Sequence, residues 1–153
     1  MRLQKHLLYE NWAFPSDEVM KDDFSEYKKK EMSKWKSRAD RMGFRFPIFE
    51  TFDDFKQALQ GAEVVDLTKQ MDNRIQNRSQ SSSIESLKSL VGTYIRPRDV
   101  DRIVQGLMSG ARLPMPIVLK GNNGMWIMAG NTRLDSAFIL GKKPKVLMVD
   151  VTE

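Results

Sequence analysis

Cysteine is absent from the chain, and histidine occurs only once, as His6. These two absences exclude disulfides, thiolate catalysis, cysteine-ligated metals and any site that needs several histidines. No run of about 18 apolar residues occurs, so the sequence predicts no transmembrane helix. The first residues lack the apolar centre of a secretory signal, and we expect a cytoplasmic protein with no membrane partner. Any chemistry must therefore use carboxylates, hydroxyls, lysine, arginine and backbone amides.

Negative charge is in short supply toward the end of the chain. The 153 residues carry 25 lysines and arginines against 20 aspartates and glutamates, a net charge of +5. Most of the excess lies in residues 91–153, which hold 9 basic and 5 acidic side chains. A modest basic bias fits a phosphate-bearing partner such as a nucleotide or DNA, and it is also common in domains that bind neither.

The spacing of apolar residues predicts an α+β fold. Intervals of three and four predict helices within residues 27–42, 51–61, 82–94 and 96–110. Short apolar runs between turn signals predict strands at 62–67, 113–120, 125–130 and 145–151. We expect a small mixed sheet with helices in residues 62–153, preceded by a helical, basic and aromatic extension in residues 1–61.

Several local features refine this division. Residues 1–26 have scattered apolar groups and are expected to form a loosely ordered arm, and the polar segment 68–83 is expected to form a loop. Capping boxes are predicted at Thr51 with Asp54 and at Ser82 with Glu85. The extension is also rich in tryptophan and phenylalanine, which either form a docking surface for a partner or pack over the core.

The segment "MAGNTRLDSAFILG", residues 128–141, marks a strand that turns into a helix. Gly130 permits a positive φ and a close approach of a ligand to the backbone. Asn131 or Thr132 can cap the helix, whose first amides lack partners and bind anions readily. Arg133 lies in the first turn, where a positive charge is unfavourable. It either binds a phosphate through its guanidinium or pairs with a surface carboxylate such as Asp135.

The stretch "LPMPIVLKGNNGMWIMAGNTRLDSAFILGKKPKVLMVDV" resembles the nucleotide-binding core of the ParB/sulfiredoxin superfamily. It has that family's "PI.V" strand, hairpin, "G-x-x-R" corner opening a helix, "LG" after the helix and final apolar strand. The preceding "RPRDVDRIVQGLMSGARL" resembles the family helix that ends before the "PI" strand. The resemblance covers about residues 62–151. The chain is similar to small stand-alone versions of this domain that bacteriophages and plasmids encode. If it is encoded by a phage, the resemblance implies that the protein is located in the host cytoplasm.

The resemblance implies that the chain binds ATP or CTP, with Mg²⁺ bridging the phosphates. The phosphates would lie at the "GNTR" stretch, residues 130–133, here called the GNTR corner. A second phosphate-contacting box follows the first strand in such proteins. "DNRIQNRSQ" lies in a comparable place, which makes Asn77 and Arg78 candidates. Lys120 or Lys142 is expected to add positive charge.

The chain also departs from the family pattern. The catalytic cysteine of sulfiredoxins is missing, and Thr132 stands where those enzymes have a histidine, so sulfinic-acid repair is not implied. Chromosome-partition members have a glutamate at the position of Asn131 and an arginine at that of Thr132. Those members continue into a helix-turn-helix domain, which we do not expect here.

Three functions stay open on the sequence alone. The first is a nucleotide-dependent phosphotransferase, kinase or NTPase, with Asp99 and Asp101 as candidate catalytic carboxylates. The second is a ParB-like nuclease on DNA, which would need clustered carboxylates for metal ions. The third is a module that binds nucleic acid or protein without turnover. Asp135 is expected to be structural, and Asp135→Asn to lower stability by well under about 1 kcal/mol.

Overall fold

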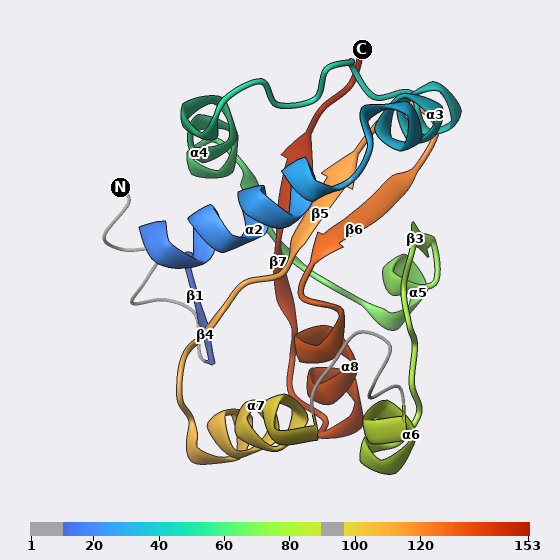
Figure 1. The fold of residues 1–153 in the computed structure, drawn as a ribbon. Coiled ribbons are helices and arrows are strands. Elements are labelled where there is room, and N and C mark those ends of the chain that lie inside the picture. The colour runs from blue at the N-terminus through green and yellow to red at the C-terminus, as the bar shows by residue number, and fades with distance from the viewer. Residues whose placement is uncertain (1–10, 90–96) are drawn as a thin grey trace.

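The computed structural model describes residues 11–89 and 97–153 and has an α+β architecture (Figure 1). The strands are β1 (Trp12–Ala13), β2 (Glu63–Asp66), β3 (Ile75–Gln76), β4 (Leu113–Pro114), β5 (Ile117–Lys120), β6 (Met125–Ala129) and β7 (Lys145–Asp150). The helices are α2 (Asp17–Lys29), α3 (Met32–Met42), α4 (Phe52–Gln60), α5 (Lys69–Asp72), α6 (Ile84–Ser89), α7 (Pro97–Ser109) and α8 (Asn131–Ile139). The predicted fold class is therefore confirmed.

A mixed sheet with the strand order β2-β7-β5-β6-β3 forms the centre of the molecule. β5 and β6 form an antiparallel hairpin, with Ile117 opposite Ala129 and Lys120 opposite Met125. β7 runs parallel to β5 and antiparallel to β2, so the last strand of the chain is an inner strand. The predicted strand–turn–strand–helix–strand unit is confirmed, and α8 connects β6 to β7.

Both faces of this sheet are buried. Side chains alternate between the faces along a strand, so Ile117 and Leu119 enter one core while Val118 enters the other. The larger core is filled from α2, α3 and α4, and the smaller one from α5 and α8, which supplies Leu134 and Phe138. Strands buried on both faces read as continuous apolar runs, which is how β5 and β7 appear in the sequence.

Residues 17–29 form the regular helix α2, so the expectation of a loosely ordered arm is wrong for this part of the chain. The hydroxyl of Ser16 caps the helix and accepts from the amide of Val19 at 3.2 Å. Met20, Phe24 and Tyr27 then recur at intervals of four and three and pack against the larger core. This apolar stripe, rather than helix propensity alone, holds α2 across the sheet.

Most aromatic residues of the N-terminal part belong to the core, whereas Phe46 is 37% exposed. Trp12, Trp35, Phe44 and Phe49 are at most 3% exposed. The indole nitrogen of Trp12 also donates to the carbonyl of Lys143 at 2.9 Å. Of the two roles left open for these aromatics, packing over the core is therefore the one observed for these four residues.

Two further local predictions have different outcomes. The capping box at α4 is confirmed, because Thr51 and Asp54 each accept from the other's amide, at 3.1 and 3.2 Å. The predicted capping residue of α6 is wrong by one position. The hydroxyl of Ser83, not that of Ser82, accepts from the amide of Ser86 at 3.0 Å.

The segment 68–83 is not the simple loop that its polar composition predicts. It contains α5, capped by Thr68, and β3, whose Ile75 is buried and pairs with Met125 of β6. The segment therefore closes one edge of the sheet. Val91 and Tyr94, which the predicted helix 82–94 included, lie outside the described residues.

Candidate functional site

The GNTR corner begins with a glycine whose conformation is demanding. Gly130 is the N-cap of α8 and has φ 98°. A Cβ placed there would lie 2.5 Å from the Cβ of Pro116, so a side chain fits neither the backbone angle nor the space. The first helical bond runs from the amide of Leu134 to the carbonyl of Gly130. Within the described residues the three amides before Leu134 make no hydrogen bond, and no side chain caps the helix.

The guanidinium of Arg133 folds back over this corner. Its Nη2 atom lies 2.9 Å from the position that a Cβ of residue 130 would take. Its Nε atom is fully buried and has no hydrogen-bond partner among the described residues. Burial lowers the pKa of Arg133, and the nearby carboxylate of Asp23 partly offsets that shift. A buried cation without hydrogen-bonded partners is costly, which makes it a candidate for binding an anion.

Asp23 extends toward the same corner from α2. Burial raises the pKa of its carboxyl group to about 6, opposed by the charge of Arg133 and increased by those of Asp22 and Glu26. Its Oδ2 atom is also buried without a partner in residues 11–89 and 97–153. Asp23 and Arg133 thus attract each other, but no ion pair of contact length joins them within these residues.

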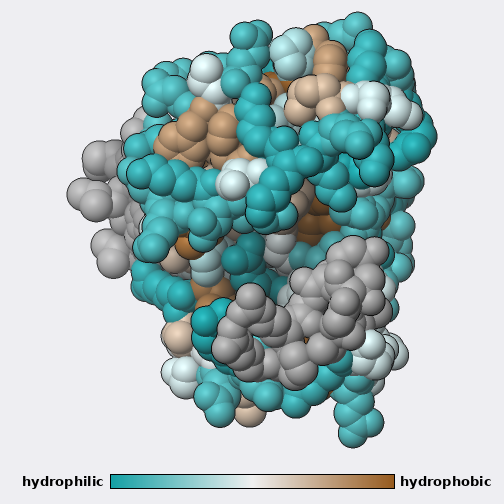
Figure 2. All heavy atoms as spheres, in the orientation of Figure 1, coloured by the Kyte–Doolittle hydropathy of each residue, from teal (hydrophilic) through white to brown (hydrophobic). Residues whose placement is uncertain are grey.

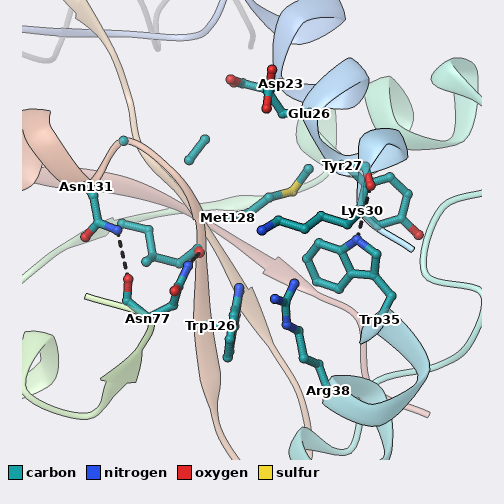
Figure 3. Close-up of a pocket in the computed structure, with 13 residues that line it drawn as sticks. Asp23, Glu26, Tyr27, Lys30, Trp35, Arg38, Asn77, Trp126, Met128 and Asn131 are labelled. Carbon is teal, nitrogen blue, oxygen red and sulfur yellow. Dashed lines mark hydrogen bonds between the residues drawn. The ribbon is translucent and has the colours of Figure 1, made fainter. Parts of the chain in front are cut away.

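Two hollows meet at the corner, and Gly130 and Asn131 line both. The first, of about 440 Å³, is lined by the corner together with Arg102, Ile103, Leu113 and Pro114. The second, of about 390 Å³, is shown in Figure 3. Asp23 and Glu26 of α2 lie at one end of it, while Lys30 and Arg38 extend toward its centre. Within the described residues, the corner therefore borders a hollow on two sides.

The walls of the second hollow combine charge with aromatic surface. The guanidinium of Arg38 lies 4.7 Å from the ring centre of Trp35 and 4.5 Å from that of Trp126. Burial lowers the pKa of Arg38. The surrounding face of the molecule is largely hydrophilic, and hydrophobic atoms show there in small groups and recesses (Figure 2).

Arg78 lies on the other side of the first turn of α8 and is fully engaged. Its Nε donates to Asp72 and its Nη2 to Asp135, both at 2.6 Å, and the three side chains are at most 2% exposed. The hydroxyl of Ser79 and the amide of Ser81 also donate to Asp135. The suggested role of Arg78 as a phosphate ligand stays a prediction, but its guanidinium is held by protein carboxylates in this structure.

The side chain of Asn131 belongs to the same network. Its Oδ1 accepts from Arg78 at 2.5 Å and from the amide of Ser79 at 3.1 Å, while its Nδ2 donates to the carbonyl of Asn77 at 2.8 Å. Asn77 in turn donates to the carbonyl of Ile127. The structure thus brings Asn77, Arg78 and Asn131 together, and these bonds fix the loop 77–79 to α8. The backbone amide of Asn131, rather than its side chain, is left to face a ligand.

Asp135 is structural, as predicted, but the expected size of its contribution is wrong. It does not pair with Arg133, and it is not a surface residue near the helix start. Because it is 1% exposed and accepts a charge-assisted bond from Arg78, its loss leaves a buried cation poorly compensated. Asp135→Asn should therefore lower the free energy of unfolding by about 1.5–3 kcal/mol rather than by well under 1 kcal/mol.

The remaining candidates lie away from the GNTR corner or are paired. Lys120 pairs with Met125 at the far end of the hairpin, about 10 Å along the strand from the residues next to the corner. The expectation that Lys120 binds phosphate there is therefore wrong. Asp99 pairs with Arg102 at 3.0 Å, and Asp101 pairs with Lys88 at 2.6 Å. Of the four residues in these two ion pairs, only Arg102 lines a hollow at the GNTR corner.

Asp23 is the site residue that sequence reasoning missed. It lies between Met20 and Tyr27, whose spacing with Phe24 is helical, so the signal for a packed helix was present. The many charges around these apolar residues obscured it. Nothing local in the sequence indicates that this helix crosses the sheet next to α8.

No protein-family model, no curated protein and no solved structure matches the chain. None of the helices in the described ranges has the length and apolar content that crossing a membrane requires. The chemistry of the corner and the sequence motif are therefore the features from which a function can be inferred.

Proposed function

We propose that the protein is a nucleotide-binding protein of ParB/sulfiredoxin type, and that the GNTR corner binds the phosphates of ATP or CTP. One observation carries the proposal: within the described residues, the buried Nε of Arg133 has no hydrogen-bond partner, its Nη2 lies close to Gly130, and the first three amides of α8 make no hydrogen bond. Helix N-termini attract anions through their free amides and the helix dipole. A guanidinium adds a geometry that matches two phosphate oxygens.

The surroundings of the corner support a ligand larger than a single phosphate group. The two hollows that share Gly130 and Asn131 have volumes of about 440 and 390 Å³, within the range of small-molecule sites. Arg102 lines the first and Arg38 the second, so positive charge is present on both sides. A nucleotide spanning the corner would place its phosphates between these groups.

We further propose that the bound nucleotide supports phosphoryl transfer or hydrolysis, as in a phosphotransferase, kinase or NTPase. Such reactions depend mainly on positioning and on stabilising charge, which the corner amides and Arg133 would provide. The candidate carboxylates Asp99 and Asp101 are both in ion pairs, which weakens the case for either as a base. No observation favours the alternatives of a DNA nuclease or of a module without turnover, and both stay predictions.

Calorimetric titration with ATP, CTP and GTP tests the binding step. Arg133→Ala removes a charge-assisted contact worth roughly 1.5–3 kcal/mol, so affinity for the preferred nucleotide should fall about 10- to 150-fold. Arg133→Lys should recover only part of the binding, because an ammonium group does not bind two oxygens in parallel. Lys120→Ala, which removes the same charge at the far end of the hairpin, is the matched control and should bind like wild type.

The variants must also be compared by thermal melting. Arg133→Ala should fold normally, because the side chain it removes makes no hydrogen bond within the described residues. Wild-type protein that binds none of the three nucleotides, or Arg133→Ala protein that binds as tightly as wild type, would refute the proposal. Nucleotide hydrolysis, measured with and without small hydroxyl-bearing acceptors, then tests the catalytic step.

A further inference from the structure

The N-terminal part of the chain separates its charges along the second hollow. Residues 11–26 hold five acidic side chains and one basic one, whereas residues 27–45 hold eight basic and two acidic ones. The fold keeps this separation, because Asp23 and Glu26 lie at one end of the hollow while Lys30 and Arg38 extend toward its centre (Figure 3). An anion that enters the hollow is therefore attracted toward Lys30 and Arg38 and repelled by the acidic end.

Arg38 is positioned between two indoles. Its guanidinium lies 4.7 Å from the ring centre of Trp35 and 4.5 Å from that of Trp126. The indole nitrogen of Trp35 donates to the carbonyl of Tyr27 at 3.1 Å, and Trp126 belongs to the inner strand β6, so both rings are held by the fold. Stacking uses the flat faces of a guanidinium and leaves the N–H groups at its edge available to an oxyanion.

No carboxylate neutralises Arg38 or Lys30. Within the part of the chain that the structure describes, neither side chain takes part in an ion pair or a hydrogen bond. The neighbouring Lys29 differs, since it pairs with Glu26 at 2.9 Å. Burial and the charge of Arg41 lower the pKa of Arg38, and a bound anion would counter this shift. The hollow thus has two cations whose hydrogen-bond donors are free to bind a ligand.

We propose that Arg38 and Lys30 form an oxyanion site, separate from the GNTR corner, for a small molecule that carries a phosphate or carboxylate group. Both residues belong to the N-terminal part of the chain, outside residues 62–151. Trp126, which contacts Arg38, lies four residues before Gly130, about 13 Å along an extended chain. A guanidinium binds either group through two parallel hydrogen bonds, and an ammonium adds a second positive charge.

The shape of the site favours a small molecule over a nucleic-acid strand. The hollow has a volume of about 390 Å³, which is within the range of small-molecule sites. Proteins that bind single strands stack the bases on exposed aromatic rings. Trp35 and Trp126 are only 3% and 8% exposed, so little ring surface is left for a base. The site therefore offers hydrogen bonds to one oxyanion rather than a stacking surface.

The experiment uses Arg133→Ala protein, in which the phosphate site of the proposed function is removed. Inorganic phosphate and malonate are titrated in separate arms at pH 7.5, with sodium chloride keeping the ionic strength constant. Calorimetry and tryptophan fluorescence report binding, because Trp35 and Trp126 contact Arg38 directly. Saturable binding of either anion is expected, and the anion that binds more tightly identifies the group that the site prefers.

Further substitutions in this protein assign the binding to the hollow. Arg38→Gln should weaken it roughly 10- to 150-fold, because a charge-assisted contact is lost. Arg38→Lys should recover only part of the affinity, since an ammonium does not bind two oxygens in parallel. Lys30→Gln removes an exposed charge and should cost about 2- to 5-fold. Arg41→Gln is the matched control: Arg41 also lies over Trp126, at 5.8 Å, but does not line the hollow, and its loss should cost less than about 3-fold.

Three results would overturn the inference. The first is Arg133→Ala protein that binds neither anion. The second is equal loss in Arg38→Gln and Arg41→Gln, which would show that the general charge of α3 attracts anions; a single-stranded oligonucleotide should then bind more tightly than either small anion. The third is an Arg38→Gln variant of the wild-type chain that loses as much nucleotide affinity as Arg133→Ala, which would make the hollow part of the nucleotide site.

The test also separates this inference from the proposed function. Wild-type protein that binds no nucleotide but binds phosphate through Arg38 would refute the proposed function and support the oxyanion site. Thermal melting checks the fold of each variant, and Arg38→Gln should melt like its parent because Arg38 makes no hydrogen bond within the described residues. If Arg38→Gln unfolds, Arg38→Lys replaces it, and undiminished binding in Arg38→Lys would then count against the site.

Discussion

Two arginines flank the first turn of α8, and their surroundings are opposite. Arg78 donates to two buried carboxylates and to Asn131, with each of these bonds between 2.5 and 2.6 Å. Arg133 is partly buried within one turn of Asn131, yet its Nε has no partner among the described residues. The difference separates an arginine that is bonded into the fold from one to which we assign a ligand in the proposed function.

The contrast between Arg78 and Arg133 predicts that substituting the two residues has different effects on stability. A buried ion pair is weak evidence for net stability, but removing one partner leaves an uncompensated charge that is strongly destabilising. Arg78 balances two such charges, whereas Arg133 has no salt bridge within the described residues and only the nearby, partly solvated Asp23 offsets its charge. Loss of Arg78 should therefore act on folding, and loss of Arg133 on binding.

The largest effect on stability is expected from substituting Arg78, the arginine that pairs with two buried carboxylates. Arg78→Met keeps much of the length of the side chain but leaves Asp135 without its cation and Asp72 with only the ammonium of Lys69, 3.4 Å away. The free energy of unfolding should fall by about 3–5 kcal/mol. Arg133→Met is the matched control and should change it by less than about 1 kcal/mol. Urea denaturation measures the free energy of unfolding of both variants. Equal losses would show that Arg78 and Arg133 contribute alike to stability.

A smaller effect on stability is expected at Gly130, where the chain enters the first turn of α8. Gly130→Ala combines a left-handed backbone, which disfavours alanine by roughly 1–2 kcal/mol, with overlap against Pro116 that adds about 1–3 kcal/mol. Gly141 also has a positive φ, of 69°, but nothing lies within 4 Å of its Cβ position. Gly141→Ala should therefore show the backbone contribution alone. Similar stability losses at both sites would mean that the close approach to Pro116 is not important.

The smallest expected effect is the dependence of stability on pH that Asp23 produces. The pKa of Asp23 is raised from 3.8 to about 6 in the folded protein, so the folded state binds a proton that the unfolded state does not bind between these values. This group therefore makes the protein more stable as the pH falls from about 7 toward 4. At pH 7.5, Asp23→Asn should be more stable than wild type by about 1 kcal/mol, allowing for partial exposure of the group.

At pH 5 this advantage should largely disappear, because most of the wild-type carboxyl groups are then protonated. Denaturation at the two pH values measures the difference. Asp22→Asn, which is exposed, should shift stability by less than about 0.5 kcal/mol at either pH. A stabilisation by Asp23→Asn that is the same at pH 5 and 7.5 would show that Asp23 is not the titrating group.

Prediction from sequence succeeded where the signal was local. The strand, hairpin and helix of residues 113–151 each have their own apolar period and turn residues, and the box at Thr51 is contained in four residues. The GNTR corner was found for the same reason: a glycine, two polar residues and an arginine are adjacent in the chain. Such patterns depend on backbone geometry, which neighbouring residues determine.

Prediction failed where distant segments decide the role of a residue. Arg78 and Asp135 are 57 positions apart, and only the folded sheet places their charges together. Lys120 is ten positions before Gly130, but the β5–β6 hairpin places it at the end of the strands that lies away from Gly130. Asp23 reaches the corner because α2 crosses the sheet. None of these placements leaves a pattern in the neighbouring sequence, so charge and composition alone did not reveal the ion pair of Arg78 with Asp135, misplaced Lys120 and missed Asp23.

The central position of β7 has a consequence for the order of events during synthesis. β7 separates β2 from β5, so neither of these strands has its inner neighbour until residues 145–150 have left the ribosome. Trp12, near the other end, likewise waits for the carbonyl of Lys143. Pairings between segments so far apart in sequence form slowly, and the edges of β2 and β5 that pair with β7 stay without hydrogen-bond partners until then. We therefore expect the five-stranded sheet to form only once residues 145–150 are available for pairing, so that β7 controls the point at which the chain can fold.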